Sequence, residues 1–381
     1  MAAMSEFNPK IKLDPGRQEQ AKEYNRIRRR LMVGDLVIGG LYTLAWLLLG
    51  WSEVLRDALL RLTNNDWLLV AGFAAVFGGF YLLINLPLSY YSGFVLPHRY
   101  EMSTQSLKGW VVDQIKGFLV GGVLGLLLLE VIYAVLRAFP DTWWLWAAGI
   151  LLLFSVLLAN LAPILLMPLF YKFVPLGEEH ADLVERLMRL ADAANTRVQG
   201  VFKFDMSRRT KAANAGLTGL GNTRRILLGD TLIDEFTADE IETVLAHELG
   251  HHVHKDIPLG MAFETALTLV GLYLASLVLS WGASIFGFIS PSDVAAMPLF
   301  VIVMGIYGLV TMPVGNAFSR WRERRADEYA LQVTGKGVAY ASALTRLANQ
   351  NLSEVDPEPW VEFLLYSHPA LGKRIAMAEA Y

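Results

Sequence analysis

Residues 143–170 read WWLWAAGILLLFSVLLANLAPILLMPLF, a stretch of 28 residues without a charged side chain. A helix of about 20 apolar residues is long enough to cross the hydrocarbon core of a bilayer, so this stretch predicts a membrane span. Five further apolar runs reach a similar length, at 31–51, 67–90, 117–138, 257–288 and 297–318. The sequence therefore predicts a mainly α-helical, polytopic membrane protein with six spans.

The composition of the whole chain agrees with this class. Of its 381 residues, 54% are hydrophobic and only 18% are charged, and the mean hydropathy is +0.39. The chain contains no cysteine, which excludes disulfides, thiolate metal ligands and a cysteine nucleophile. No small-residue cleavage site follows the first apolar run, so we expect that run to stay as a permanent span rather than to be removed as a signal peptide.

Two longer polar regions, 171–256 and 319–381, are separated by the last two spans at 257–318. We expect them to form one domain whose two parts come together in space. The chain then begins with a polar segment, 1–30, and the first four spans occupy 31–170. In this organisation the spans form one block and the divided polar domain forms the other.

Lysine and arginine side chains gather in alternate connecting segments. They are frequent in the N-terminal segment, after the second span and in both polar regions, whereas the other connections are short and carry few. With six spans, all of the basic segments lie on one side of the membrane, which the positive-inside rule assigns to the cytoplasm. We therefore expect a cytoplasmic polar domain and the lipid bilayer as a partner, and we expect no nucleic-acid partner.

The first polar region contains short strand signals and a well-marked helix start. Residues 198–204 alternate as in a strand and 225–228 read as a second strand, while the Gly-rich stretch 214–221 suits an exposed edge or turn. Thr237 and Glu240 have the spacing of a capping box, and apolar residues follow at helical spacing. The region therefore predicts a small α/β domain with a helix that begins after Thr237.

That helix carries His247-Glu248-Leu249-Gly250-His251. Residues four apart lie on one face of a helix, so the imidazoles of His247 and His251 can bind a single zinc ion. Glu248 then lies beside the metal, where it can take a proton from a zinc-activated water and pass it to the leaving amine. The alternative is a helix with solvated histidines, but a chance match to this pattern is expected in only about one such chain in a hundred.

A catalytic zinc site needs a third protein ligand and an open position. Glu323 and Asp327 follow the last span and are four residues apart, hence on one helical face. Glu323 can then bind the metal while Asp327 orients a ligating imidazole through its free N–H. On spacing alone, an amphipathic helix whose acids neutralise its arginines is an equally good interpretation.

Four groups of residues together resemble the type I CAAX prenyl endopeptidases, a family of integral-membrane zinc proteases. The resemblance covers most of the chain. Its motifs are HELGH at 247–251, SRWRERRAD at 319–327, Asn-Ala at 214–215 with RILLGDTL at 225–232, and Ser-His-Pro at 367–369 followed by Arg374. The resemblance implies a zincin-like metalloprotease domain in a membrane protein of six to seven spans, since the eukaryotic members have seven.

The resemblance also implies the ligands of the metal. Glu323 would be the third ligand, with His247 and His251, of one Zn²⁺ per chain. Asp327 would accept a hydrogen bond from the free N–H of a ligating imidazole and so orient it.

Further residues would contact the substrate. Asn214 and Ala215 would belong to an edge strand along which the substrate backbone lies. His368 and Arg374 would face the cleft and stabilise the oxyanion or a substrate carboxylate. Gly216 stands where relatives often carry an aromatic residue, so we expect a different substrate preference.

The sequence thus predicts a zinc endopeptidase, with Glu248 as general base, that cleaves membrane-associated or prenylated CAAX-type peptides and proteins. One alternative is a quality-control metalloprotease of the heat-shock type, which shares the zinc motifs but is shorter and has fewer spans. Another is a non-catalytic membrane scaffold with a vestigial site, against which the intact motif argues. The absence of cysteine and of a basic C-terminal retrieval signal favours a bacterial inner membrane.

Overall fold

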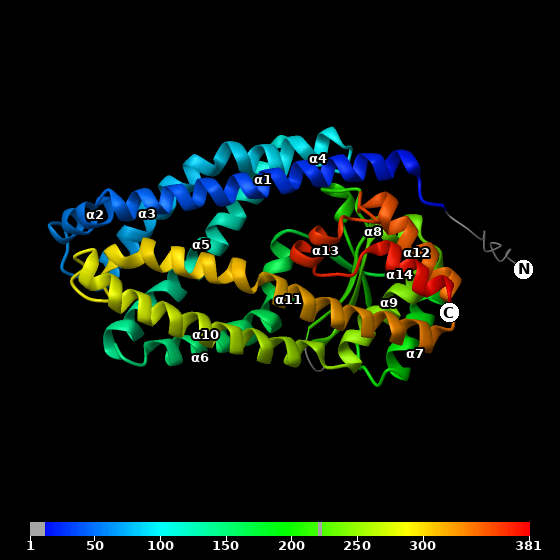
Figure 1. Cartoon of the computed structure of the whole chain (residues 1–381). Helices are drawn as coiled ribbons and strands as arrows, with labels where there is room; N and C mark the ends of the chain where they lie inside the picture. Colours follow the sequence, from blue (N-terminus) through cyan, green and yellow to red (C-terminus); the bar gives the residue numbers. More distant parts are fainter. Residues whose placement is uncertain (1–11, 220–222) are drawn as a thin grey trace, which may run out of the picture.

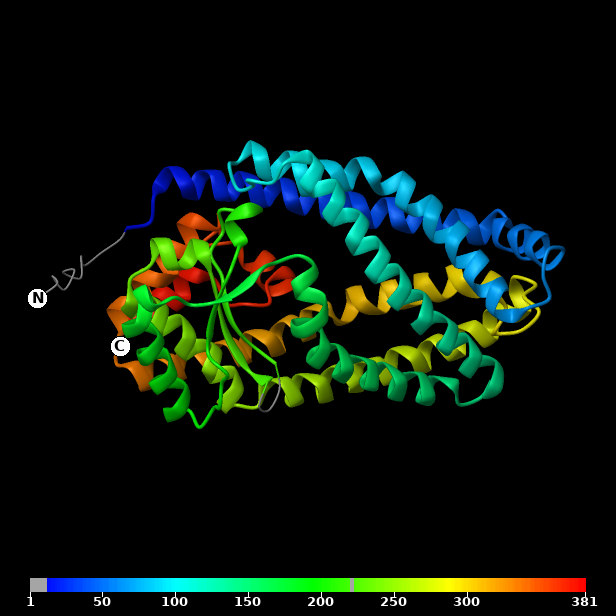
Figure 2. The same cartoon turned by 180° about the vertical axis from the view of Figure 1, so that it is seen from behind.

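The computed structural model describes residues 12–219 and 223–381. The start of the polar segment 1–30 and the last two residues of the Gly-rich stretch 214–221 lie outside the described residues. The molecule is elongated, with long helices at one end and a small sheet with its covering helices at the other (Figures 1 and 2). This division into a helical block and an α/β domain agrees with the prediction from the sequence.

Six helical segments among the described residues are long and apolar enough to cross a bilayer. Their main helices are α1 (Pro15–Leu48), α3 (Asp66–Tyr90), α5 (Leu107–Ala138), α6 (Trp143–Leu161), α10 (Asp256–Ile285) and α11 (Met297–Thr334). Each contains one of the six predicted apolar runs or most of it. Six is the lower of the two numbers that the resemblance allows.

Two of these segments change their helical geometry near the α/β domain. The third helix continues through η1 (Tyr91–Val95), a π-helical turn, into α4 (Leu96–Arg99), and α6 continues through η2 (Ala162–Leu166) and η3 (Met167–Leu169). Both π-helical turns lie close to prolines, which lack the N–H that an α-helix requires. At the remote end of the molecule the short helix α2 (Trp51–Leu60) joins α1 to α3.

The first span is continuous with the polar segment before it. Asp14 caps the start of α1 with its carboxylate, and the polar first half of the helix reaches the C-terminal part of the chain. There the Asn25 amide donates to the Leu352 carbonyl at 3.0 Å, and Arg29 pairs with Glu354 at 3.1 Å. The N-terminal helix therefore ties the membrane block to the α/β domain.

The sheet has four strands in the order β1-β2-β4-β3. They are β1 (Phe173–Pro175), β2 (Val201–Phe204), β3 (Ala215–Thr218) and β4 (Arg225–Gly229), of which β2 and β4 run parallel and β1 and β3 are antiparallel to their neighbours. Both predicted strands are present, although β2 starts three residues later than expected, after Gly200 with its φ of +150°. The stretch predicted as an exposed edge supplies β3, which lies at the edge of the sheet.

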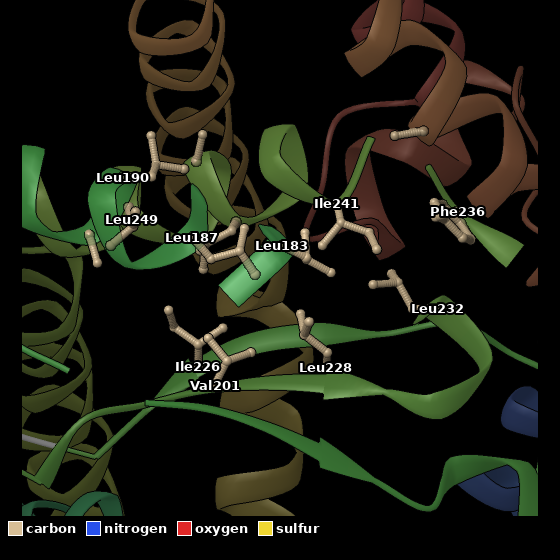
Figure 3. Packing of buried hydrophobic residues seen from close by; sticks show 14 of the residues in the cluster. Leu183, Leu187, Leu190, Val201, Ile226, Leu228, Leu232, Phe236, Ile241 and Leu249 are labelled. Carbon is tan, nitrogen blue, oxygen red and sulfur yellow. The ribbon is translucent and has the colours of Figure 1, made fainter. Parts of the chain in front are cut away.

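Helices cover the sheet and enclose the core of the α/β domain. They are α7 (Ala181–Ala193), α8 (Asp230–Glu235), α9 (Ala238–Val253), α12 (Gly337–Gln350), α13 (Pro359–Leu365) and α14 (Leu371–Glu379), with 3-10 turns at Glu178–His180 and Met206–Arg208. A further 3-10 turn, Val294–Ala296, directly precedes α11 and packs against α2 and α10 in the membrane block. Figure 3 shows Leu187 of α7, Ile226 and Leu228 of β4 and Leu249 of α9 meeting in this core, all fully buried. Complete burial of a leucine or isoleucine side chain contributes about 1.5–3 kcal/mol to folding.

Helix α9 begins at the predicted capping box: the Thr237 hydroxyl accepts from the Glu240 N–H, and the Glu240 carboxylate accepts from the Thr237 N–H. Helix α11 packs against α9, and the two lie close together at Gly250, where a Cβ atom would lie 2.9 Å from Ala326 Cα. Gly250 thus leaves room for the backbone of α11. This close approach brings the first turns of α11 beyond the membrane beside the histidines of α9.

The predicted boundary between spans and polar domain at 318/319 falls inside a helix. Apolar and charged halves of α11 form one helix of 38 residues from Met297 to Thr334. No glycine or proline interrupts the sequence Phe318-Ser-Arg-Trp-Arg-Glu323, so nothing ends the helix where the apolar run ends. The last span therefore passes directly into the α/β domain.

Candidate metal centre

One face of α9 carries the two histidines of the HELGH motif. The rings of His247 and His251 lie 4.8 Å apart between centroids, with an angle of 87° between their planes. Leu245 and Leu249 of the same helix are fully buried in the core, which fixes the rotation of the helix. His247 and His251 lie two positions from these leucines and therefore point away from the core. Both imidazoles face α11, where Glu323 contacts them.

Glu323 of α11 completes a group of three ligand residues. Its Oε2 lies 3.3 Å from His247 Nε2, and its Oε1 lies 3.3 Å from His251 Nε2. One potential ligand atom from each of the three residues lies within 4.8 Å of the others. Two imidazoles and one carboxylate are a common protein ligand set of catalytic zinc sites.

The electrostatics of this group fit a cation between the three side chains. Burial disfavours a charged imidazole, yet the carboxylates of Asp327 and Glu323 raise the pKa of His247 to about 9. The Oε2 atom of Glu323 is buried and has no hydrogen-bond partner among the described residues. A metal ion would satisfy this carboxylate oxygen and replace the proton on the histidine, so the residues present fit a zinc ion.

A buried polar cluster holds His247 from its other side. His247 Nδ1 lies 2.8 Å from Asp327 Oδ1, which agrees with the supporting position predicted for Asp327. The Tyr340 hydroxyl donates to the same carboxylate, and Arg374 donates to both of its oxygens, through Nε at 2.8 Å and Nη2 at 2.6 Å. A carboxylate that accepts from the free N–H of a ligating histidine fixes its tautomer and its orientation.

Arg374 lies elsewhere than the resemblance implied. Its side chain is only 9% exposed, and its guanidinium binds Asp327 behind His247 instead of opening into the cleft. The cause is the buried Asp327 carboxylate, whose two oxygens match the planar fork of an arginine. His368, by contrast, is 58% exposed, and its Nε2 lies 3.3 Å from Glu323 Oε1 on the open side of the group.

His251 has its own supporting carboxylate, which the sequence analysis missed. Asp256 Oδ2 lies 2.8 Å from His251 Nδ1. Asp256 begins α10, the fifth span, only five residues beyond His251, and a carboxylate so close to a predicted ligand was the available signal. Tyr340 on α12 was missed as well, and no motif around it points to the metal centre.

We predict that Asp256→Asn weakens zinc binding about tenfold, because loss of a supporting carboxylate reduces both the orientation and the basicity of a ligating histidine. Competition with a chromogenic chelator measures the affinity. Asp234→Asn, an exposed aspartate on α8, is the matched control. Equal affinities of the Asp256→Asn and wild-type proteins would contradict this role.

Glu248 lies beside the three ligand residues and is half-buried. Burial raises the pKa of its carboxyl group, while the neighbouring His247 and His251 lower it. A carboxylate whose pKa lies closer to neutrality than usual is better suited to accept and return a proton.

Ala215 begins the edge strand β3, and Asn214 directly precedes it. The Gly229 N–H donates to the Asn214 carbonyl at 2.9 Å, and the register then pairs Ala215 with Leu228. Hydrogen-bonded and non-hydrogen-bonded pairs alternate along antiparallel strands. The backbone groups of Ala215 and Leu217 therefore point to the free edge, away from β4.

Comparison with known families agrees with this geometry. Residues 178–381 match peptidase family M48, and residues 6–172 match the CAAX prenyl protease N-terminal domain with its five membrane helices. The chain belongs to peptidase family M48. Within 12–172 the described structure has four helices of spanning length, together with the shorter α2.

The relatives of this M48 chain include proteins from bacteria and fungi. An uncharacterized metalloprotease, YhfN of Bacillus subtilis, is 29% identical over 98% of this chain and 88% of its own length. The probable CAAX prenyl protease 1 of Schizosaccharomyces pombe is 31% identical over 77% of this chain and 62% of its own length. The crystal structure of S. mikatae Ste24p superimposes with a TM-score of 0.86 at 25% identity, covering 97% of this chain and 91% of that one.

These similarities confirm the class predicted from the sequence. The M48 protein is an integral membrane metalloendopeptidase related to the CAAX prenyl proteases. Membership of the family implies a metal ion, generally zinc, and the structure contains a group of two histidines and one glutamate that can hold it.

Proposed function

We propose that this protein is a zinc endopeptidase that cleaves membrane-associated, lipidated peptides or proteins beside the bilayer. The observation that carries the proposal is the junction of α9 and α11, where a helix that leaves the membrane brings Glu323 within 3.3 Å of both His247 and His251. We assign these three residues as the ligands of one Zn²⁺ per chain. When bound, zinc supplies Lewis acidity that lowers the pKa of water and polarises a carbonyl group.

The residues around the ligands then have separate tasks. Glu248 takes a proton from the attacking water and returns it to the leaving amine nitrogen. His368, exposed on the open side of the group, donates to the oxyanion of the tetrahedral intermediate. Asp327 and Arg374 act indirectly: the arginine holds the carboxylate, and the carboxylate holds His247.

The free edge of β3 binds the substrate backbone in this proposal. An extended peptide can add to an open strand edge through main-chain hydrogen bonds, and the N–H and C=O groups of Ala215 point outward. Helix α9 packs against β3, so a peptide on this edge lies near the helix that bears the catalytic motif.

Ala215→Pro is expected to raise KM about fivefold with little change in kcat, since one backbone hydrogen bond to substrate contributes about 1 kcal/mol. Proline is tolerated at an edge-strand position whose N–H does not pair within the sheet. Ala215→Val keeps the N–H and serves as the control. If both variants showed the same KM, the peptide would not pair with this residue.

The similarity of residues 6–172 to the CAAX protease membrane domain supports a prenylated substrate over the heat-shock type of quality control. The basic connecting segments support a cytoplasmic α/β domain, which in a bacterium would lie beneath the inner membrane.

The test uses purified protein in detergent and a farnesylated CAAX peptide, with the same peptide lacking the farnesyl group as the matched comparison. Release of the C-terminal tripeptide from the farnesylated peptide alone would support the lipidated class. Equal cleavage of both peptides would show that the enzyme does not recognise the farnesyl group. Cleavage of neither, together with degradation of an unfolded membrane protein, would favour quality control.

A further inference from the structure

A cavity of about 600 Å³ opens where the membrane block meets the α/β domain, on the side of α5 and away from the candidate metal centre. It lies between the first turns of α5, the end of the α6 segment at η3 and the turn after β2. Figure 2 shows the start of α5 and the end of the α6 segment together at the boundary between the long helices and the sheet. The residues of the metal centre do not line this cavity.

The cavity is strongly basic. Among its lining residues one side chain is acidic, Asp113, and five are basic: Lys108, Lys116, Lys172, Arg208 and Arg209. Arg209 binds both oxygens of Asp113 at 2.8 and 3.1 Å, so this pair is internally neutral. The remaining cations give the cavity a clear positive charge.

Two exposed cations of the cavity have no acidic partner: in the described part of the chain no carboxylate forms an ion pair with Lys108 or Lys172. Arg208 pairs with Asp205 at 3.1 Å but remains 60% exposed. Since like charges gathered around one cavity repel each other, an anion bound there would be stabilised by all three.

The position along the spans points to a lipid as the source of the anion. Lys116 directly precedes the apolar run of α5. Its Nζ donates to the carbonyl of Leu169, the last residue of the α6 segment. The cavity therefore lies where the apolar parts of both spans end. Val112 and Leu169 line it with side chains that are 41% and 45% exposed, so an apolar surface adjoins the basic one.

We propose that this cavity binds the phosphate headgroup of an anionic phospholipid from the leaflet on the side of the α/β domain. Lys108, Lys172 and Arg208 contact the phosphate, and the first part of each acyl chain lies along Val112 and Leu169. Basic cavities between membrane helices at this level are typical binding sites for anionic lipid headgroups. A free phosphate carries the same anionic group but has no acyl chain that could contact the apolar surface.

The test is a native mass spectrometry titration of the detergent-solubilised full chain with phosphatidylglycerol and, separately, with phosphatidylcholine. We expect tighter binding of phosphatidylglycerol. In the double variant Lys108→Gln/Lys172→Gln its affinity should fall about 25-fold, because each basic residue near a lipid surface contributes about fivefold. Lys108→Arg/Lys172→Arg should restore binding. Arg189→Gln/Arg197→Gln, which removes two exposed arginines outside the cavity, should leave it unchanged.

Three results would overturn the proposal. One is equal binding by the wild type and the Lys108→Gln/Lys172→Gln variant, with peptidase activity showing that the variant is folded. The second is equal affinity for phosphatidylglycerol and phosphatidylcholine. The third is displacement of the lipid by inorganic phosphate at a comparable concentration, which would assign the cavity to a free anion.

Discussion

Glu248→Gln is expected to retain its metal ion and to hydrolyse peptide about a thousandfold more slowly than the wild type. The amide keeps the size and shape of the carboxylate but cannot accept the proton of the attacking water. Glu248 is not among the three residues whose ligand atoms gather between α9 and α11, so binding of the metal should not depend on its charge. Single-turnover cleavage measures the rate, and elemental analysis measures the metal.

Glu235→Gln provides the control, because Glu235 is an exposed carboxylate at the end of α8 and should behave as wild type. Full activity of the Glu248→Gln protein would refute Glu248 as the general base. Loss of the metal together with the activity would instead make Glu248 a ligand.

Glu323→Gln is expected to lose both the metal and the activity. The carboxylate supplies the only negative charge among the three proposed ligands, and without it the site consists of two imidazoles and a neutral amide. We expect zinc affinity to fall more than about 100-fold, since even loss of a group behind a ligand costs about 10- to 100-fold. Chelator competition gives the affinity, and excess zinc should restore part of the activity.

Glu328→Gln is the matched control on the same helix. Glu328 is exposed, and among the described residues its ion pair is with Arg324 one turn away, so its removal should leave zinc affinity unchanged. Stoichiometric zinc at wild-type affinity in the Glu323→Gln protein would show that another residue is the third ligand.

Local signals in the sequence were sufficient for most elements. The capping box at Thr237 and Glu240 located α9, and the spacing of His247 and His251 placed both on one face, because each of these features depends on a few neighbouring residues. The apolar runs located the spans for the same reason. The three-residue strand β1, which ends in Pro175, was too short to produce a period that could be recognised.

Long-range contacts explain what could not be predicted. The spacing of Glu323 and Asp327 left a ligand and a charged helix face as equal interpretations until the family resemblance was considered. Tyr340 reaches Asp327 only because α12 packs against α9, a contact that no local pattern records. The family resemblance placed Arg374 in the cleft. Its burial was missed because it depends on a carboxylate 47 residues earlier in the chain.

The continuity of α11 sets a distance. Its apolar run ends at Phe318, and Glu323 follows five residues later on the same helix, a rise of about 8 Å. Because α11 is one continuous helix, it fixes the distance between the candidate metal centre and the hydrocarbon layer. For the anchored substrates of the proposed function, we therefore expect that a bond is cut only if its tether lets it reach that height, so that the length of chain between anchor and scissile bond contributes to selection as well as the side chains.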